Sequence, residues 1–426
     1  QPTGQPAGQP VARQQAGQPA GSFAGQGGPA MTQPPLVFPP QGAPQTSGAP
    51  APSSQPASSR VTVPGYPSGP AAPAEEKVDT GPLPSRETLR REARAASSRR
   101  GAGDADVERA GVLLKSVADI FSQRVVGQEQ LRTALVTSLM SSGHILLESV
   151  PGLAKTTAAQ TLASAVSGSF RRIQCTPDLM PNDIVGTQIL NSSTGEMTTQ
   201  LGPVHANIVL LDEINRSSAK TQSAMLEAMQ ERQTSIGGVV YPLPHPFMVL
   251  ATQNPIEEEG TYVLPEAQMD RFLMKEVLTY PRPSEEADVL DRISNGSFDQ
   301  PVTGRPISTD DVEWLQRAAE RVYVDPVIKQ YIVALINTSR GGGPRPVPGL
   351  DRQVRVGASP RGGIALMKVA QAVALQEGRT YVIPDDVRLL RHGVLRHRLV
   401  LTYDALADGI APEAIIDAIF AAVPTP

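Results

Sequence analysis

Cysteine, aromatic side chains and long apolar runs are all scarce in this chain of 426 residues. Its one cysteine, Cys175, excludes a disulfide within the chain, and no segment has the charged start and apolar centre of a signal peptide. With aromatic residues at 4%, a packed core must rely on aliphatic side chains. No apolar run approaches the roughly 20 residues of a transmembrane helix. The net charge of -4 lacks the basic excess of proteins that coat nucleic acid. We therefore expect a cytoplasmic protein with no transmembrane segment and no nucleic acid as its main partner.

Residues 1 to about 80 have little charge and no helical period. They run through repeats such as GQPAGQP, and such a stretch cannot bury enough apolar surface to offset the entropy of ordering. A basic run follows, which fits either a solvated linker or a contact with anionic lipid or nucleic acid. It contains Arg86, Arg90, Arg91, Arg94, Arg99 and Arg100. We predict a disordered tail and basic linker over residues 1–103.

From Asp104 onward, apolar residues recur at helical or strand spacing. Two amphipathic helices come first, and strand-like segments then alternate with helices, which is typical of a parallel sheet covered on both faces. After Tyr280 the strand-like runs stop, so we predict an α/β core over residues 104–282 and an α-helical domain over residues 283–426. The Gly- and Pro-rich stretch 341–359 is predicted to be a mobile loop. The predicted strands are 144–148, 171–175, 208–211 and 247–252, and predicted helices start at Lys155 and cover 219–232.

The stretch HILLESVPGLAKTTAA has the outline of the phosphate-binding pattern GxxxxGK[ST] with Ser149 and Ala154 in place of its two outer glycines. A short strand would lead into a loop, and the helix that starts at Lys155 would point its free N–H groups at a bound phosphate. We expect Lys155 to neutralise β- and γ-phosphate oxygens, Thr156 to bind Mg²⁺, and Gly152 to let the backbone approach closely. We also expect Ala154 to have a helical φ and Ser149 to avoid a positive φ, so Ser149 is the more serious departure.

The stretch NIVLLDEINRS places Asp212 and Glu213 at the carboxyl end of a buried strand. Two adjacent acids there are costly to bury unless a metal or another cation accompanies them. We expect Asp212 to hold Mg²⁺ and Glu213 to orient and deprotonate the attacking water. The alternative is an exposed strand end followed by a helix cap.

Two further residues fit the same pocket. Asn254 follows the strand in FMVLATQNP and could position the water opposite the γ-phosphate, or it could form an Asx turn before Pro255. Arg271 lies at a helix-to-strand corner in LPEAQMDRFLMK, where a salt bridge to Asp270 or Glu266 is the ordinary expectation.

Together, these motifs resemble the MoxR branch of the AAA+ ATPases. The stretches PGLAKT, TPDLMPNDIVGT, GPVHANIVLLDEINRS, ATQNPIEEEGTYVLPEAQMDRF and SPRG occur in that family's order, and the match covers residues 104–426. The resemblance implies an AAA+ P-loop NTPase core with inserted β-hairpins, followed by an α-helical lid domain. It also implies ATP bound with Mg²⁺ between the subunits of a ring, which is expected to be a hexamer.

The resemblance also implies roles for single residues. Arg271 resembles the arginine finger that reaches the neighbouring subunit's nucleotide, and Arg361 resembles the second sensor, which couples phosphate contact to lid movement. Val126 and Gly127 resemble the segment bordering the adenine. The implied nucleotide-binding loop comprises Pro151, Gly152, Leu153, Ala154, Lys155, Thr156 and Thr157.

Two predicted hairpins, one in GTQILNSSTGEMTTQLGP and one in TSIGGVVYPLP, fit the clade's inserts and are either substrate contacts or ordinary surface hairpins. The resemblance implies an ATP hydrolase that remodels or matures protein clients, with a partner that carries a von Willebrand A domain. Such a partner could bring it to the inner face of the membrane. Two alternatives stay open: a nucleotide-gated scaffold with little turnover, and a nucleic-acid-remodelling motor.

Overall fold

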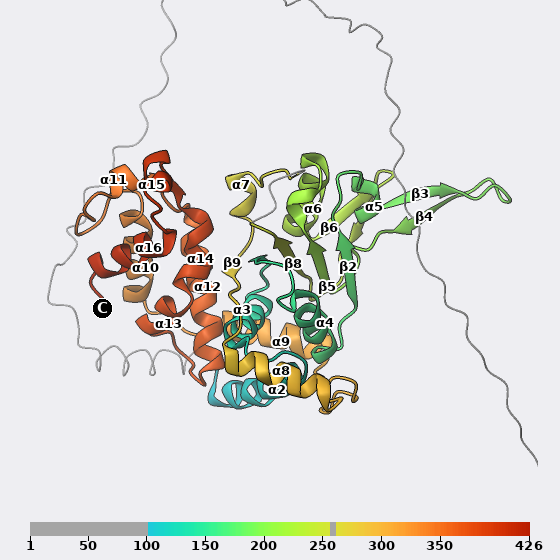
Figure 1. Cartoon of the computed structure of the whole chain (residues 1–426), viewed down its shortest axis with the longest axis horizontal. Helices are drawn as coiled ribbons and strands as arrows, with labels where there is room; N and C mark the ends of the chain where they lie inside the picture. Colours follow the sequence, from blue (N-terminus) through green and yellow to red (C-terminus); the bar gives the residue numbers. More distant parts are fainter. Residues whose placement is uncertain (1–100, 256–260) are drawn as a thin grey trace, which may run out of the picture. The chain divides into compact units, whose positions relative to one another are not determined.

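The computed structural model describes residues 101–255 and 261–426 (Figure 1). The predicted disordered tail lies almost wholly outside the described residues, as does the basic run at 86–100. No helix in the described ranges is both long enough and apolar enough to cross a membrane.

A parallel five-stranded sheet forms the centre of the α/β core, in the order β2-β5-β8-β1-β9. All four predicted strands are confirmed within one or two residues, but β9 was not predicted. β9 has the sequence MKEV, which neither alternates apolar with charged residues nor forms a continuous apolar run, and it pairs with β1 at the edge of the sheet. Lys275 of β9 forms an ion pair of 2.6 Å with Glu148 of β1. The strands are β1 Ile145–Glu148, β2 Phe170–Gln174, β5 Ile208–Asp212, β8 Met248–Gln253 and β9 Met274–Val277.

The two faces of the sheet are buried in two separate hydrophobic clusters. Alternate residues of β5 show this, since Leu210 belongs to one cluster and Leu211 to the other. The first cluster includes α2 Asp104–Arg124, α3 Glu129–Met140 and α4 Lys155–Ala165, and the second includes α6 Ala219–Glu231. Met225 and Met229 of α6 are buried in the second cluster. The α/β class is thereby confirmed.

Both predicted hairpins are present. The first pairs β3 Gly186–Leu190 with β4 Met197–Leu201, after the short α5 Pro181–Val185, and the second pairs β6 Gln233–Ile236 with β7 Val239–Pro242. Gly237 and Gly238 make the second turn with φ of 59° and 81°, a region that favours glycine. Ile189, Leu190 and Met197 of the first hairpin are exposed. Figure 1 shows this hairpin projecting from the rest of the core.

Helices dominate the chain after residue 280, but the prediction that strands stop there is wrong. Val354–Val356 (β10) pairs antiparallel with Val400–Leu401 (β11), and the predicted mobile loop contains both β10 and the short helix α11 Leu350–Gln353. These strands are too short to show a period. The longer helices are α8 Pro283–Ser294, α9 Thr309–Glu320, α10 Pro326–Thr338, α12 Pro360–Gln376 and α16 Pro412–Ala422, and the shorter ones are α7 Glu266–Met269, α13 Pro384–Leu389, α14 Arg391–Leu395 and α15 Tyr403–Ala407.

Candidate nucleotide site

Three predicted groups of residues meet at one edge of the sheet. β8 lies between β5 and β1, and all three strands are parallel, so their carboxyl ends share an edge. The loop that leads to Lys155 follows β1, Asp212 ends β5, and Asn254 follows β8. Ligands of open α/β sheets bind at this edge.

The loop before α4 is open to an anion. Gly152 has a φ of 87°, and a Cβ built there would meet no atom within 4 Å. No side chain caps the N-terminus of α4, so its first N–H groups remain available. The Nζ of Lys155 has one hydrogen-bond acceptor, the Ser149 carbonyl oxygen at 3.5 Å. The chemistry of this loop fits a bound phosphate.

The backbone conformation at Ala154 differs from the prediction. Ala154 has a φ of 52° and a ψ of 24°, in the left-handed region, where a helical φ was expected. For a residue with a Cβ, this conformation costs roughly 1–2 kcal/mol. Ser149, which was considered the more serious departure, has no positive φ, is buried, and donates its hydroxyl to the Val150 carbonyl oxygen at 3.0 Å. The strain of the loop therefore lies at Ala154.

A cavity of about 800 Å³ adjoins the loop. It is lined by six of the residues predicted to bind the nucleotide: Val126, Pro151, Gly152, Leu153, Ala154 and Thr157. Gly127 follows Val126 with a φ of 67°, and a Cβ there would lie 2.5 Å from the carboxyl carbon of Glu285. The same cavity is lined by Tyr280, Leu290 and Phe298, which the sequence had not indicated.

Two arginines accompany the acids at the end of β5. Arg172 of β2 forms an ion pair with Asp212, with Nε 3.1 Å from Oδ2, and the Thr252 hydroxyl donates to Oδ1 at 2.7 Å. Arg216 lies 3.0 Å from Oε2 of Glu213, which also accepts from the Gln174 amide at 3.1 Å. The structure thus supplies the cations that the burial of these acids requires.

The sequence had indicated none of these partners. Arg172 and Gln174 are two residues apart on β2, so their side chains lie on the same face of the strand. This spacing identifies them as partners of the acids only once β2 is known to pair with β5. Glu213 itself has a φ of 57° in the left-handed region, which is typical of strain held at a functional site. Burial, together with the nearby charges of Asp212 and Glu213, raises the pKa of the Cys175 thiol to about 12.

Arg271 and Arg361 lie elsewhere, in a cationic pocket of about 270 Å³. This pocket and the nucleotide cavity share no lining residue. The other cationic residues that line it are Arg232, Lys368 and Arg398. The structure therefore brings Arg271 together with Arg361, but neither of them with the loop of its own chain.

The alternative of a salt bridge from Arg271 to Asp270 or Glu266 is wrong. Asp270 pairs with Arg398 at 2.8 Å, and Glu266 pairs with Arg355 at 3.2 Å. Arg271 instead donates to the Leu226 carbonyl oxygen at 3.0 Å, and no ion pair of its guanidinium is present in residues 101–255 and 261–426.

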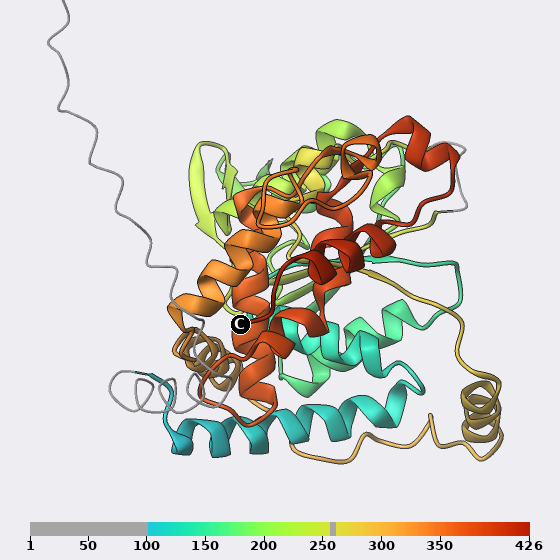
Figure 2. The same ribbon diagram turned by 90° about the vertical axis from the view of Figure 1, so that its left-hand side faces the viewer.

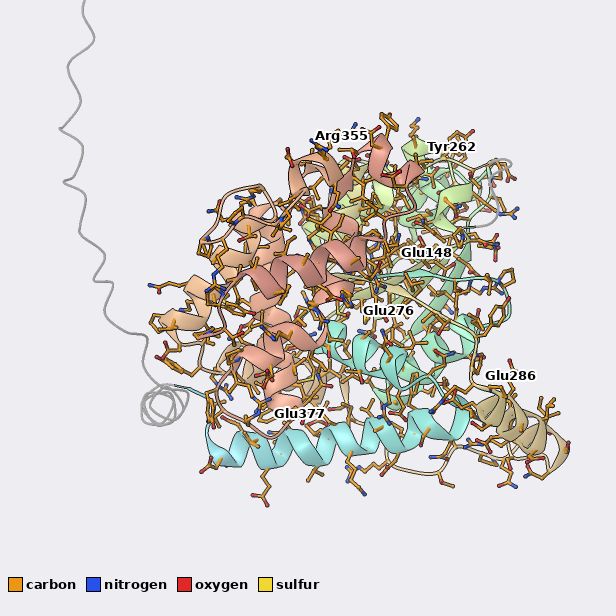
Figure 3. The ribbon with its side chains drawn as sticks, turned by 60° about the vertical axis from the view of Figure 1, so that its left-hand side comes forward. Glu148, Tyr262, Glu276, Glu286, Arg355 and Glu377 are labelled. Atoms are coloured by element: carbon orange, nitrogen blue, oxygen red, sulfur yellow. The ribbon has the colours of Figure 1, made fainter. Side chains whose placement is uncertain are left out.

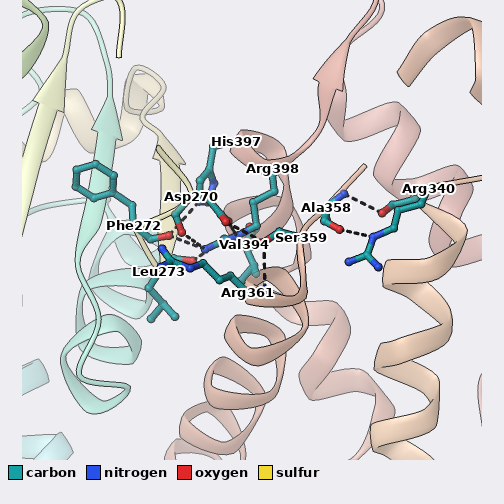
Figure 4. Close-up of polar contacts among 11 residues, drawn as sticks. Asp270, Phe272, Leu273, Arg340, Ala358, Ser359, Arg361, Val394, His397 and Arg398 are labelled. Carbon is teal, nitrogen blue, oxygen red and sulfur yellow. Dashed lines mark hydrogen bonds and ion pairs between the residues drawn. The ribbon is translucent and has the colours of Figure 1, made fainter. Parts of the chain in front are cut away.

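Asp270 ties the corner before Arg271 to the start of α12 (Figure 4). Its Oδ1 accepts from Nε of the buried Arg398, and its Oδ2 accepts from the Ser359 hydroxyl, both at 2.8 Å. Burial lowers the pKa of Arg398 to about 10, and the nearby Arg361 adds to this effect while Asp270 opposes it. Ser359 caps α12 two residues before Arg361, so one carboxylate links the segments that carry Arg271 and Arg361.

Known proteins resemble this chain over both the α/β part and the helical part. A profile of the ATPase family associated with various cellular activities (AAA) matches residues 144–274, and an AAA lid domain profile matches residues 350–419. Chaperone MoxR1 of Mycobacterium tuberculosis is 48% identical over 302 residues, which are 71% of this chain and 79% of that protein. Protein MoxR of Methylorubrum extorquens is 31% identical over 328 residues, which are 72% of this chain and 93% of that protein. A solved Cytophaga hutchinsonii structure is 40% identical, has a TM-score of 0.70, and covers 79% of this chain and 99% of its own.

Proposed function

Since the chain belongs to the MoxR family of AAA+ ATPases, we propose that it hydrolyses ATP at the contacts between copies of itself in a ring and so remodels protein clients. The observation that carries this proposal is the separation of the two sites. The phosphate-binding loop and the acids lie at one edge of the sheet, whereas Arg271 and Arg361 line a different pocket. A complete site then needs two chains, which form a ring if the contact closes, and we propose a hexamer.

The loop would hold the triphosphate. Gly152 and the open N-terminus of α4 offer backbone N–H groups, and Lys155 adds a positive charge with few competing acceptors. Val126 and Gly127 would border the adenine. Thr156 and Asp212 would hold Mg²⁺, because Oδ1 of Asp212 accepts one hydrogen bond, from the Thr252 hydroxyl, and keeps its second lone pair. When bound, Mg²⁺ supplies positive charge against the β- and γ-phosphate oxygens.

Glu213 would act as the general base. It lies at the same sheet edge, and it must exchange its contacts with Arg216 and Gln174 for the attacking water. Asn254, which follows the neighbouring strand β8, would position that water.

Arg271 of the neighbouring chain would act as the arginine finger, and Arg361 beside it would act as the second sensor. A finger of this kind is worth about 10³- to 10⁵-fold in rate. The absence of a carboxylate partner for Arg271 within residues 101–255 and 261–426 supports this role. The tie between Asp270, Ser359 and Arg398 would transmit a contact at Arg271 to the first turn of α12.

The cellular role is proposed from the similarity to a named relative. The M. tuberculosis protein carries the name of a chaperone, and we propose a chaperone-like function on protein clients here. The exposed Ile189, Leu190 and Met197 of the first hairpin offer an apolar client contact. We further propose an α/β core over residues 104–282, a lid over residues 283–426, a partner with a von Willebrand A domain, and action in the cytoplasm or at the inner membrane face through that partner.

Steady-state ATPase assays, with native mass measured in parallel, test the proposal. We expect Lys155→Ala, Glu213→Gln and Arg271→Ala each to abolish most turnover, with Glu213→Gln still binding nucleotide. If the wild-type protein binds ATP without hydrolysing it, the chain is a nucleotide-gated scaffold instead. The ion pairs of Asp212 and Glu213 with arginines favour this alternative.

A further inference from the structure

Helix α8 has an apolar face that this chain leaves uncovered. None of its 12 residues is buried, although Val289, Leu290 and Ile293 share one face by their helical spacing. The side chains of Leu290 and Ile293 are 64% and 61% exposed. Extended segments flank the helix (Figure 2), and Arg292 anchors it to α2 by donating to the Ser122 carbonyl oxygen at 2.9 Å. A helix of this length is marginal in water without packing, so its apolar face needs a partner.

A groove between α10 and α12 is the second uncovered apolar surface. It encloses about 460 Å³ and is lined by Ile332, Val333, Ile336, Ile364 and Met367. Val333 is 66% exposed and Ile364 is 54% exposed. Exposed apolar grooves of this kind mark contacts with other molecules.

The two surfaces adjoin the two halves of the proposed ATP site. Ile364 lines both the groove and the cationic pocket that holds Arg271 and Arg361. Leu290 of α8 lines the nucleotide cavity. When the cationic pocket of one chain meets the nucleotide cavity of the next, the groove and α8 are brought to the same contact.

The charges at the two surfaces are complementary. Glu286 lies one turn from Leu290 on α8 (Figure 3), and no basic partner contacts it among the described residues. Lys329 lines the groove and has no acidic partner in the same part of the chain. Opposite charges beside an apolar contact favour one docking orientation.

We propose that α8 of one copy of this chain binds in the α10–α12 groove of the neighbouring copy, beside the shared ATP site. The proposal rests on the ring described under the proposed function and specifies what holds its subunits together. Because α8 also lines the nucleotide cavity, a nucleotide bound there could change the position of α8 and so of the helices α10 and α12 of the neighbouring copy.

Disulfide trapping tests this contact. Cys175 is buried, and its pKa of about 12 keeps the thiol protonated, so it does not compete for oxidation. Ile293→Cys protein is mixed with a differently tagged Val333→Cys protein, a slowly hydrolysed ATP analogue is added, and the mixture is oxidised. We expect a disulfide-linked dimer with one copy of each variant. The control replaces Ile293→Cys with Asp291→Cys, two residues away on the opposite side of α8, and should give only background linkage.

Assembly provides the second measurement. Ile293→Asp and Val333→Asp should each raise the protein concentration needed for assembly about tenfold or more, with native mass as the readout and circular dichroism showing folded protein. A ring that assembles and hydrolyses ATP without the mixed disulfide overturns this contact and leaves the proposed function standing. Protein that neither assembles nor hydrolyses ATP overturns both.

Discussion

At the scale of single residues, Ala154 stores strain in the phosphate-binding loop. Its φ of 52° costs an alanine roughly 1–2 kcal/mol, and a glycine very little. A glycine also makes the unfolded chain more flexible, which offsets roughly 0.4–1 kcal/mol. We therefore expect Ala154→Gly to raise the free energy of unfolding by about 0.5–1 kcal/mol, measured by urea denaturation.

Ala158, in the helix α4 that follows the loop, provides the control. It has no positive φ, so Ala158→Gly gains no relief and should lower the free energy of unfolding by about 1 kcal/mol or more. If Ala154→Gly proves as destabilising as the control, the left-handed conformation at Ala154 is not strained in solution.

Ser149 should affect nucleotide binding less than its place in the phosphate-binding motif suggests. Its φ is not positive and its hydroxyl bonds within the loop, so a glycine gains nothing from its conformational freedom there. We expect Ser149→Gly to change nucleotide affinity by less than about threefold, measured by isothermal titration with an ATP analogue. A large gain in affinity would show that the native serine impairs the loop.

The chemistry of these residues could be predicted from the sequence, whereas their conformations and partners could not. Lys155 and Asp212 stand beside strand-like runs, and this local pattern places them at the end of a strand. Arg172 can neutralise Asp212 only because β2 lies next to β5. The left-handed conformation of Ala154 depends on the path of the whole loop. Both are tertiary properties that no local pattern contains.

At the scale of elements, β2 stabilises the end of β5 through Arg172. Removing this arginine takes two hydrogen bonds from the buried carboxylate of Asp212 and leaves the one from the Thr252 hydroxyl. Because Arg172 is about half exposed, we expect Arg172→Met to lower the free energy of unfolding by only about 1–2 kcal/mol. Thermal unfolding without Mg²⁺ measures the loss.

The neighbouring Arg171 is a matched control, because it lies on the same strand and is exposed. Arg171→Met should change the free energy of unfolding by no more than about 0.5 kcal/mol. Equal effects of the two substitutions would mean that the ion pair to Asp212 contributes nothing specific.

Elements with a continuous apolar run or a helical period were predictable, and short elements without either pattern were not. The strands β1, β5 and β8 are continuous apolar runs, and α9, α10 and α12 repeat apolar residues over several turns. β9, β10 and β11 are four residues or shorter, and pairing rather than pattern defines them. The position of α8 beside the nucleotide cavity was missed because its sequence shows a helix but not what the helix contacts.

At the scale of the whole molecule, buried histidines make stability depend on pH. The Nδ1 of His144 accepts from the Val249 N–H at 3.0 Å, which requires the neutral ring. Burial, with Arg232 nearby, lowers its pKa to about 3, and burial likewise lowers the pKa of His397 well below its usual value. The unfolded chain binds these protons near pH 6.5, so these groups leave stability unchanged above about pH 7 and lower it as the pH falls.

We expect His144 alone to cost about 1.4 kcal/mol of unfolding free energy per pH unit below about 6.5, until its folded pKa is approached. Urea denaturation at several pH values measures the slope. His144→Gln keeps polar atoms without the titration, so the difference between wild type and variant isolates this histidine. Identical slopes would show that His144 titrates normally in the folded protein.

The assembled molecule offers a direct test of whether each ATP site is shared between chains. Lys155→Ala protein lacks the loop lysine but keeps Arg271, and Arg271→Ala protein has the reverse defect. In an equal mixture of the two, about a quarter of the contacts in a random ring join an intact loop to an intact Arg271, so turnover should recover to about that fraction. Mixing Lys155→Ala with Glu213→Gln restores no contact, because both defects lie on the loop side. If mixed rings form by native mass but recover no turnover, Arg271 does not act on the neighbouring chain's nucleotide.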